Sequence, residues 1–438
     1  MTTLNIRCCC EPGRVLGTIE LATAPIEEGK INTKHGVLEI REYYEKRGDQ
    51  WHTERAVVGH KHDDSSRTRR HEEVSVQQLQ GQETTMRKLA SIQTVNAVEP
   101  IPNADAIEKI RVLGWWVVSK KGEHKPGDKL VYCEIDSLLP ERAEFEFLRP
   151  CSFKPSQTHA DGGVTIPAGF RIKTVKLRGQ VSQGICFPLS ILPPDAPDEE
   201  GADVTDLLGV RKWEPPVPVG MGGKVKGGFP GFLPKTDETR VQVLEASLRR
   251  HKGKTFYVTE KLDGTSFTAF LRQGEFGICS RNLWMDEADE SNVLARVAKG
   301  LKLEEKLRAA REKLGHDVAI QAEVIGPGIQ KNKYAMKEVT LRVFSVLNVD
   351  TYRLVDHPVK LALLAQMGLE PVPQLGTIVL NHTVDELVAF SEGTSVLNPQ
   401  VQREGVVLRP LVEEYDEDIG GRLSFKAINP KFLLKYDE

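Results

Sequence analysis

One short segment places a lysine, a carboxylate and a glycine at a spacing that could support covalent chemistry. Residues 259–267 read Thr-Glu-Lys-Leu-Asp-Gly-Thr-Ser-Phe, which puts Lys261, Asp263 and Gly264 between two runs typical of strands. A lysine amine that has lost its proton can attack phosphorus, and glycine lets a ligand come close to the backbone. Because Lys-x-Asp-Gly is also typical of a hairpin turn, the segment predicts a lysyl-phosphoramidate only in combination with its surroundings.

Five later segments supply those surroundings. They are Ser-Arg-Asn at 280–282, Ala-Glu-Val-Ile-Gly at 322–326, Arg-Val-Phe-Ser-Val at 342–346, Arg-Glu-Gly-Val-Val-Leu-Arg at 403–409 and Ser-Phe-Lys-Ala-Ile-Asn at 424–429. In order and approximate spacing they resemble motifs Ia, III, IIIa, IV and V of the covalent nucleotidyltransferases, the superfamily of ligases and capping enzymes. The resemblance is strongest to ATP-dependent RNA ligases with an OB-fold domain ahead of the catalytic domain, and it runs from about Arg87 to the C-terminus.

This resemblance implies a catalytic set of three residues, Lys261, Asp263 and Lys426. Lys261 would take AMP from ATP, Glu404 would bind Mg²⁺ or Mn²⁺, and Lys426 would contact the α-phosphate. A free lysine has a pKa near 10.4, so we expect burial or a nearby cation, such as Lys426 or the bound metal, to lower the pKa of Lys261. Asp263 would support either the metal-bound waters or the nucleophile, and the sequence leaves both roles open.

The same resemblance places further residues around the nucleotide. Arg281 and Glu323 would hold the ribose and help to place the substrate end, and Phe344 would stack on the adenine. The predicted cofactor-binding residues are Glu260, Arg281, Glu323, Phe344 and Lys426. Simpler interpretations remain open, because Phe344 could be a core strand residue, and Glu323 and Glu404 could be edge-strand carboxylates in ion pairs.

One position departs from the family pattern. Many of these enzymes carry a second lysine two residues after the first in motif V, where this chain has Ile428. Lys431 and Lys435 are nearby substitutes. Lys431 lies two residues beyond Asn429, so the two side chains could face the same way only if the strand continued past Pro430.

The elements that must position these residues fall into four segments. We predict an N-terminal β-rich extension and linker at 1–86, an OB-fold domain at 87–192, a proline- and glycine-rich connector that acts as a hinge at 193–228, and an adenylyltransferase domain at 229–438. The predicted fold class is α+β: an N-terminal β module, an OB-fold β-barrel, and an ATP-grasp-like nucleotidyltransferase domain of antiparallel sheets with covering helices.

Local patterns support this division. Short strands separated by turn signals recur between residues 91 and 133, as expected for a small barrel. Apolar side chains at helical spacing indicate helices within 287–314, and Thr383 with Glu386 forms a capping box that predicts another helix start. The chain ends soon after motif V, which leaves no room for the C-terminal OB domain expected of DNA ligases and capping enzymes.

Basic residues gather in a few places where RNA phosphates could bind. Residues 249–254 and 331–334 are lysine- and arginine-rich, and either stretch could contact the strand backbone or form an ordinary solvated face. The same two interpretations apply to a group at near-alternate positions of the predicted barrel. This group is Arg171, Lys173, Lys176 and Arg178.

Composition limits the class of protein. With 438 residues and 39 % hydrophobic content, the chain should form two or three globular domains. It has no apolar run of about 20 residues that could span a membrane, and its seven cysteines show no pairing pattern. We therefore expect a cytoplasmic monomer. His60, His62 and His71 lie in a charged segment that we interpret as a solvated loop and not as a metal site.

Together these observations predict an ATP-dependent RNA ligase that seals breaks between a 3′-hydroxyl and a 5′-phosphate, most simply nicks in duplexes. Its cofactors would be ATP and Mg²⁺ or Mn²⁺, and its partner RNA or an RNA-containing nicked duplex. Two alternatives stay open: a nucleic-acid-binding protein whose transferase domain is inactive, and a DNA ligase.

Overall fold

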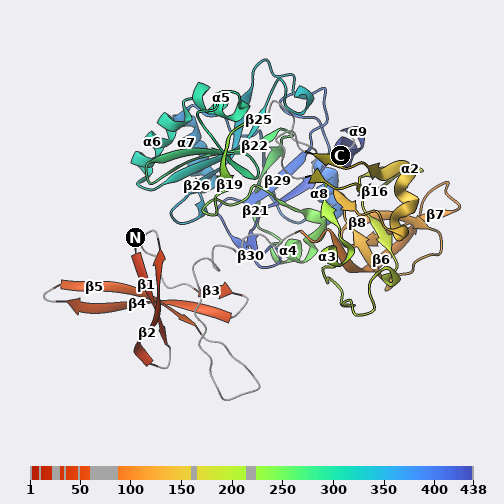
Figure 1. The fold of residues 1–438 in the computed structure, drawn as a ribbon, viewed down its shortest axis with the longest axis horizontal. Coiled ribbons are helices and arrows are strands. Elements are labelled where there is room, and N and C mark those ends of the chain that lie inside the picture. The colour runs from red at the N-terminus through yellow and green to blue at the C-terminus, as the bar shows by residue number, and fades with distance from the viewer. Residues whose placement is uncertain are drawn as a thin grey trace. The chain divides into compact units, whose positions relative to one another are not determined.

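The computed structural model describes residues 2–8, 11–21, 30–33, 36–47, 50–59, 87–158, 165–213 and 223–436 (Figure 1). The chain forms two compact units. The first comprises Met1–Thr84 with Gly231–Pro234 and Asn348–Arg353, and the second comprises the remaining chain from Thr85. The histidines at 60, 62 and 71, with the charged segment interpreted as a solvated loop, lie outside the described residues. No helix of the described segments is long and apolar enough to cross a membrane.

The N-terminal extension is a β module, as its alternating sequence predicts. Its sheet has the order β2 (Glu11–Leu21), β1 (Thr2–Cys8), β5 (Gln50–Gly59), β4 (Gly36–Arg47) and β3 (Lys30–Thr33). The neighbours pair antiparallel except for β1 and β5, which are parallel.

The OB-like barrel begins with one long strand that serves two partners. β6 (Ala90–Pro100) pairs with β9 (Lys129–Cys133) through its first half and with β7 (Ile107–Val112) through its second, and its register shifts between Val95 and Ala97. Such an irregularity bends a strand, which helps the sheet to close. β8 (Trp115–Lys120) and β17 (Ile185–Phe187) complete the order β17-β9-β6-β7-β8.

Two sheets build the catalytic domain. The larger has the order β19 (Val225–Gly228), β24 (Leu283–Met285), β23 (Glu275–Cys279), β22 (Thr265–Arg272), β25 (Val318–Ile325), β26 (Thr340–Asn348) and β27 (Arg353–Leu354). The smaller has the order β20 (Thr239–Arg240), β32 (Phe425–Ile428), β29 (Gly405–Pro410), β21 (Thr255–Lys261) and β28 (Gln374–Val379). The Lys-x-Asp-Gly segment at 261–264, here called motif I, therefore leaves the smaller sheet at Lys261 and leads into the larger one at Thr265.

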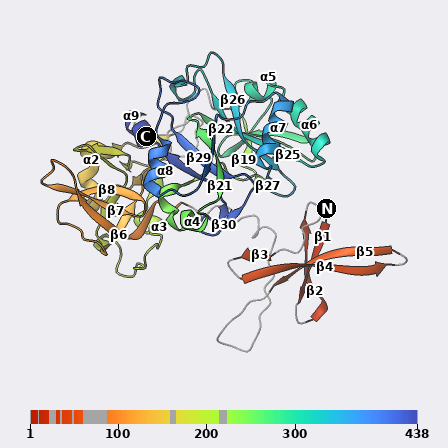
Figure 2. The ribbon, with the colours of Figure 1, turned by 180° about the vertical axis from the view of Figure 1, so that it is seen from behind.

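Three helices cover the larger sheet. Figure 2 shows α5 (Val293–Gly300), α6 (Leu303–Leu314) and α7 (His357–Met367) gathered beside β25 and β26. The first two are the helices expected within 287–314. α5 begins only after Asn292, whose side chain accepts from two backbone N–H groups, and the chain turns at Lys302, where φ is 52°. Apolar side chains from all three helices share one core with the sheet.

Two further helices lie near the smaller sheet. α8 (Val384–Ser391) starts at the predicted capping box, in which Thr383 and Glu386 bind each other's backbone N–H groups. α9 (Pro430–Tyr436) follows motif V directly. Its side chains complete a core with the barrel, formed by Val95, Ile110, Val112, Trp115, Val117, Leu130, Tyr132 and Ile135 on one side and Ile428, Phe432 and Leu433 on the other.

Further contacts hold the barrel against the catalytic domain. The Gly114 N–H donates to the carbonyl oxygen of Gln242 at 2.8 Å, and Arg111 forms an ion pair with Asp385 at 2.7 Å. A Cβ added at Gly114 would lie 2.7 Å from the Gln242 oxygen, so this glycine permits the close approach. The barrel and the catalytic domain therefore share a core in this structure, and the hinge role of the connector at 193–228 stays a prediction.

Candidate active site

The nucleophile candidate stands at the end of a strand, beside a carboxylate from the neighbouring strand. Lys261 is opposite Gly405 in the antiparallel pair of β21 and β29, which brings Glu404 next to it. The Lys261 Nζ donates to Glu404 Oε1 at 2.6 Å. The other carboxylate oxygen of Glu404 is buried and has no hydrogen-bond partner among the described residues.

The glycine of motif I is required for close packing and not for an unusual backbone conformation. A Cβ on Gly264 would lie 2.3 Å from the carbonyl oxygen of Val324 on β25. Its N–H donates to Glu323 Oε1 at 3.0 Å, and Glu323 is opposite Ser266 in the pair of β22 and β25. Motifs I and III are thereby fixed to each other through the backbone.

The charges around Lys261 do not have the effect expected from the sequence. Burial lowers the pKa of Lys261, but the carboxylates of Glu404 and Glu323 outweigh it, so that the pKa is raised. The expectation that the pKa of Lys261 is lowered is therefore wrong for the protein without bound nucleotide or metal. Burial also raises the pKa of Glu323 to about 8, against the attraction of Lys261 and with the help of Glu404.

Near Lys261, the lysine whose pKa is lowered is Lys426. Lys426 is the register partner of both Val407 on β29 and Arg240 on β20. Burial, Arg240 and Lys261 together lower its pKa to about 7. Arg240 was not identified from the sequence, because only the pairing of β20 with β32 shows that it lies beside motif V.

Arg240 joins the barrel to this cluster of cations. One of its terminal nitrogens donates to Asp136 of the barrel at 3.0 Å, and its Nε and Nη1 are buried without a hydrogen-bond partner in the described part of the chain. Burial raises the pKa of Asp136, but Arg240 and Arg87 outweigh it and lower the value to about 2. The Arg240 guanidinium also lies 5.9 Å from the ring centroid of Trp115.

A cavity beside Lys261 brings together side chains from both catalytic sheets. Its lining includes Thr236, Glu238, Thr259, Glu260, Lys261, Leu262, Glu323, Phe344, Val372, Val407 and Arg409. Phe344 also packs against a small buried cluster that includes Leu262 and Val372. Both interpretations of Phe344 are thus compatible with its place, since it lines the cavity and contacts the core.

Two other predicted residues are engaged with their own neighbours. Glu260 is buried, and its Oε2 accepts from the Val396 N–H at 2.8 Å. Arg281 donates to Asp237 Oδ1 at 2.6 Å. Burial raises the pKa of Asp237, but Arg281 and Lys426 outweigh it and lower the value. Arg281 therefore approaches the cation cluster through Asp237.

Asp263 is held from two sides by consecutive residues. Its carboxylate forms an ion pair with Lys333, and its backbone N–H donates to the hydroxyl of Tyr334 at 2.7 Å. The stretch 331–334 was predicted either to contact the RNA backbone or to form a solvated face, but the Lys333 side chain is only 6 % exposed. In the other basic stretch, residues 249–254, Arg250 forms an ion pair with Asp416 and Lys254 forms one with Glu414.

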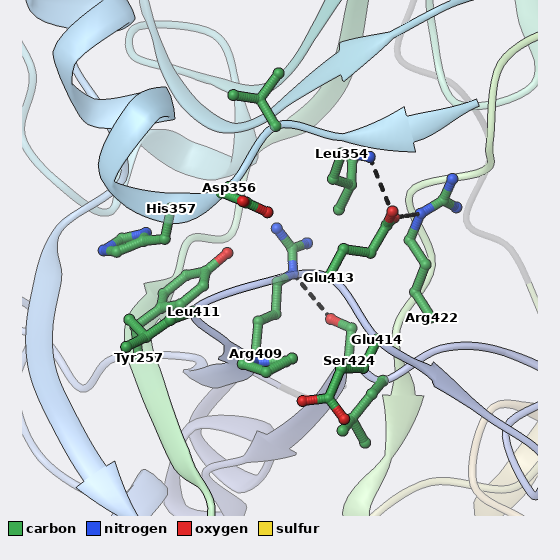
Figure 3. Close-up of a pocket in the computed structure, with 13 residues that line it drawn as sticks. Tyr257, Leu354, Asp356, His357, Arg409, Leu411, Glu413, Glu414, Arg422 and Ser424 are labelled. Atoms are coloured by element: carbon green, nitrogen blue, oxygen red, sulfur yellow. Dashed lines mark hydrogen bonds and ion pairs between the residues drawn. The ribbon is translucent and has the colours of Figure 1, made fainter. Parts of the chain in front are cut away.

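Arg409 links the two catalytic sheets behind the cavity. It projects from β29 and donates to the Phe344 carbonyl at 3.1 Å and to Ser345 Oγ at 3.0 Å, both on β26. Figure 3 shows its guanidinium near Tyr257, with the bond to Ser424 drawn. Its remaining terminal nitrogen donates to Glu238 at 2.5 Å in the cavity wall.

A buried lysine reinforces the same carbonyl. Lys360 of α7 is 2 % exposed and donates to the Phe344 carbonyl at 3.0 Å. Burial, with a smaller contribution from Arg409, lowers its pKa to about 7. Arg409 and Lys360 thus both bind the Phe344 carbonyl, and no periodic pattern in the sequence identifies Lys360.

The proposed substitutes for the second motif V lysine lie elsewhere. β32 ends at Ile428 and α9 begins at Pro430, so the strand does not continue to Lys431. The Lys431 Nζ pairs with Glu392 at 2.5 Å, and the Lys435 Nζ lies over the ring of Tyr436. Arg240 is the cation that stands beside Lys426 instead.

The oxygen-rich surroundings of Lys261 are suited to a hard divalent cation. Within the described segments no three His, Cys, Asp or Glu side chains form a ready-made metal cage. Mg²⁺ is usually held by one or two carboxylates together with waters and substrate phosphates. The buried, unpartnered oxygen of Glu404 fits that mode of binding.

Comparisons with known proteins agree with the two-domain arrangement. A family model described as an OB-fold domain matches residues 89–189, and one described as RNA ligase matches residues 254–428. A search of curated proteins finds no match.

Solved structures of Naegleria gruberi RNA ligase are similar over most of the chain. A variant without ligand is 35 % identical, with a TM-score of 0.71, over 80 % of this chain and 98 % of that chain. The complex with pyrophosphate is 36 % identical, with a TM-score of 0.71, over 80 % and 99 %. A variant with ATP and manganese is 35 % identical, with a TM-score of 0.72, over 80 % and 100 %. This chain therefore belongs to the RNA ligase family, with an OB-fold domain ahead of the ligase domain.

Proposed function

We propose that this protein is an ATP-dependent RNA ligase that joins a 3′-hydroxyl to a 5′-phosphate through AMP carried on Lys261. The observation that carries the proposal is a single cavity in which Lys261, Glu323 and Phe344 meet, with Glu404 bound to the lysine. The solved Naegleria gruberi complexes with ATP and manganese or with pyrophosphate support ATP and a divalent metal as its cofactors.

In the first step the Lys261 Nζ forms a bond to the α-phosphorus of ATP, and the bond from that phosphorus to the bridging oxygen of the β-phosphate breaks. Pyrophosphate leaves with the electron pair. The proton of the Lys261 ammonium must leave to solvent first, because Glu404, which contacts the ammonium, is the residue that would hold the metal. A divalent metal at Glu404 would screen the triphosphate and withdraw the carboxylate from its ion pair with Lys261.

Positive charge beside the α-phosphate stabilises the extra negative charge of the transition state. Lys426 and Arg240 are register partners, so the two cations can act on the same phosphate group. Phe344 would cover one face of the adenine, with its backbone held by Arg409 and Lys360. Each residue thus has a distinct role in binding or charge stabilisation.

Two further transfers complete the sealing reaction. A 5′-phosphate oxygen attacks the lysyl-AMP phosphorus, the phosphorus–nitrogen bond breaks, and a 5′–5′ pyrophosphate linkage forms. The 3′-hydroxyl then loses its proton and attacks the 5′-phosphorus, and AMP leaves. The substrate in this proposal is RNA or an RNA-containing nicked duplex.

Labelled ATP with Mg²⁺, followed by denaturing electrophoresis, tests the first step. A labelled protein band is expected, and its absence together with retained RNA binding would favour a binding protein with an inactive transferase domain. Nicked duplexes that exchange ribose for deoxyribose on each side of the nick test the substrate. Equal sealing of an all-DNA nick would favour a DNA ligase.

We further propose that the enzyme acts as a monomer in the cytoplasm. Cys133, Cys151, Cys186 and Cys279 are free thiols in the described part of the chain, which agrees with a reducing compartment. Light scattering at several protein concentrations would show a constant mass for a monomer.

A further inference from the structure

The side chain of Lys333 is enclosed although it lies outside the nucleotide cavity. It follows the short turn η5 (Gln330–Asn332) and is 6 % exposed, and its partner Asp263 is 10 % exposed. Its Nζ lies 4.6 Å from the ring centroid of Phe432 and 4.2 Å from that of Tyr436. An ammonium removed from water needs such partners, because an unpaired buried charge is strongly unfavourable.

The aromatic partners of Lys333 come from α9, which is itself tied to the catalytic motifs. Asn429, between β32 and α9, donates its N–H to the Glu404 carbonyl at 2.9 Å, and its side chain accepts from the Lys431 N–H at 2.9 Å. Phe432 also belongs to the core shared with the barrel. A continuous set of contacts therefore runs from the barrel through α9 and Lys333 to Asp263.

The geometry also gives Asp263 a fixed place. Lys333 binds its carboxylate while the next residue, Tyr334, binds its backbone N–H. Without Lys333 the carboxylate would lose this ion pair, and its position relative to the ammonium of Lys261 would be less fixed. Asp263 is close enough to Lys261 to contribute to the field at its amine.

We propose that Lys333 is a positioning residue for adenylation: held between Asp263 and the rings of Phe432 and Tyr436, it fixes the motif I carboxylate and couples it to α9 and the barrel. The inference rests on the proposed function, because adenylation of Lys261 is the reaction being positioned. Lys333 acts through Asp263 and does not touch the reacting atoms.

The full-length protein with the substitution Lys333→Met tests this role. At saturating ATP we expect its single-turnover adenylation rate to fall roughly tenfold or more, with the KM for ATP changed less than about threefold, since Lys333 does not line the nucleotide cavity. Lys333→Arg should recover much of the rate. Lys337→Met, at an exposed lysine of the same loop, is the matched control and should behave as the wild type.

Coupling to Asp263 is measured by a double-mutant cycle. In an Asp263→Asn background, Lys333→Met should have little further effect on the adenylation rate, because its partner carboxylate is already gone. An equal loss in both backgrounds would overturn the inference. So would a Lys333→Met protein that adenylates as fast as Lys337→Met.

A second pair of variants keeps the test decisive if Lys333→Met does not fold. Tyr436→Phe keeps the ring and should leave adenylation unchanged, whereas Tyr436→Leu removes it and should slow adenylation severalfold at saturating ATP. Equal rates for the two variants would contradict the coupling through α9. A wild-type chain that takes up no AMP would overturn the proposed function together with this inference, whereas normal wild-type adenylation with unaffected variants would overturn the inference alone.

Discussion

Arg240 and Lys426 lie opposite each other on paired parallel strands, and the arginine is one cause of the lowered pKa of Lys426. Arg240 also binds Asp136 of the barrel. Two neighbouring positive charges repel each other when no anion is bound, and a phosphate placed between them stabilises both. The arrangement explains why a domain outside the motifs could influence the first chemical step.

Lys261→Ala and Lys261→Arg should abolish adenylation, because no other group at this position can form the phosphoramidate. The measurement is the labelled band after denaturation, with circular dichroism as the control for folding. Covalent AMP on either variant would place the nucleophile at another residue.

Glu404→Ala and Lys426→Ala should each slow adenylation by roughly 10²-fold or more, since each removes charge stabilisation of the transition state. Lys431→Ala is the matched control, because Lys431 lies near motif V in sequence but pairs with Glu392. Single-turnover rates at saturating ATP give the comparison. A near-normal rate for Lys426→Ala would exclude it from the phosphate site.

Lys360 should make the stability of the protein depend on pH. Its pKa is lowered from 10.5 to about 7 in the folded protein, so the unfolded chain binds more protons between these values and stability rises with pH across that window. Below about pH 7 Lys360 is charged in the folded protein, and the full cost of burying that charge lowers the free energy of unfolding. The free energy of unfolding of Lys360→Met, relative to that of the wild type, should therefore be highest at pH 6 and should decrease progressively toward pH 10.

Denaturant unfolding of both proteins at several pH values measures this difference, with the exposed Lys337→Met as control. A difference between wild type and Lys360→Met that stays constant from pH 6 to pH 10 would show that Lys360 does not titrate as described.

Deleting residues 1–84 should leave nick sealing largely intact, because every motif lies beyond them. The shortened chain keeps Arg87, which binds Glu134 at 2.6 Å. Sealing of a nicked RNA-containing duplex by the deletion variant is the test. Loss of sealing in a folded protein would assign the β module a function of its own.

The barrel should be needed for more than substrate binding. A chain that starts near Phe229 lacks the barrel partners of α9, so we expect it to be less stable and to lose most nick sealing while keeping some reaction with ATP. Within the full chain, Gly114→Ala pushes a methyl group against Gln242 and should reduce sealing, whereas Gly300→Ala has open space around it and should not. Full sealing by the truncated chain would contradict this role.

The sequence was sufficient for the fold class and for the residues whose positions are set by motifs. Lys261, Glu323 and Glu404 come together as their motifs predict, since neighbouring strands carry them. Lys333 and Arg240 could not be identified in this way, because their roles depend on a loop conformation and on the pairing of two short strands. The direction of the Lys261 pKa shift was missed because the distance to Glu404 cannot be obtained from spacing.

The core shared by the barrel and α9 has a consequence for the order in which the chain acquires its structure. Val95 and Trp115 are made early during synthesis, whereas Phe432 follows every catalytic motif. Contacts between residues so distant in sequence form late, because a long loop must first close. A growing chain can therefore form the barrel strands early, but α9, the helix that encloses Lys333, docks only after translation has passed motif V.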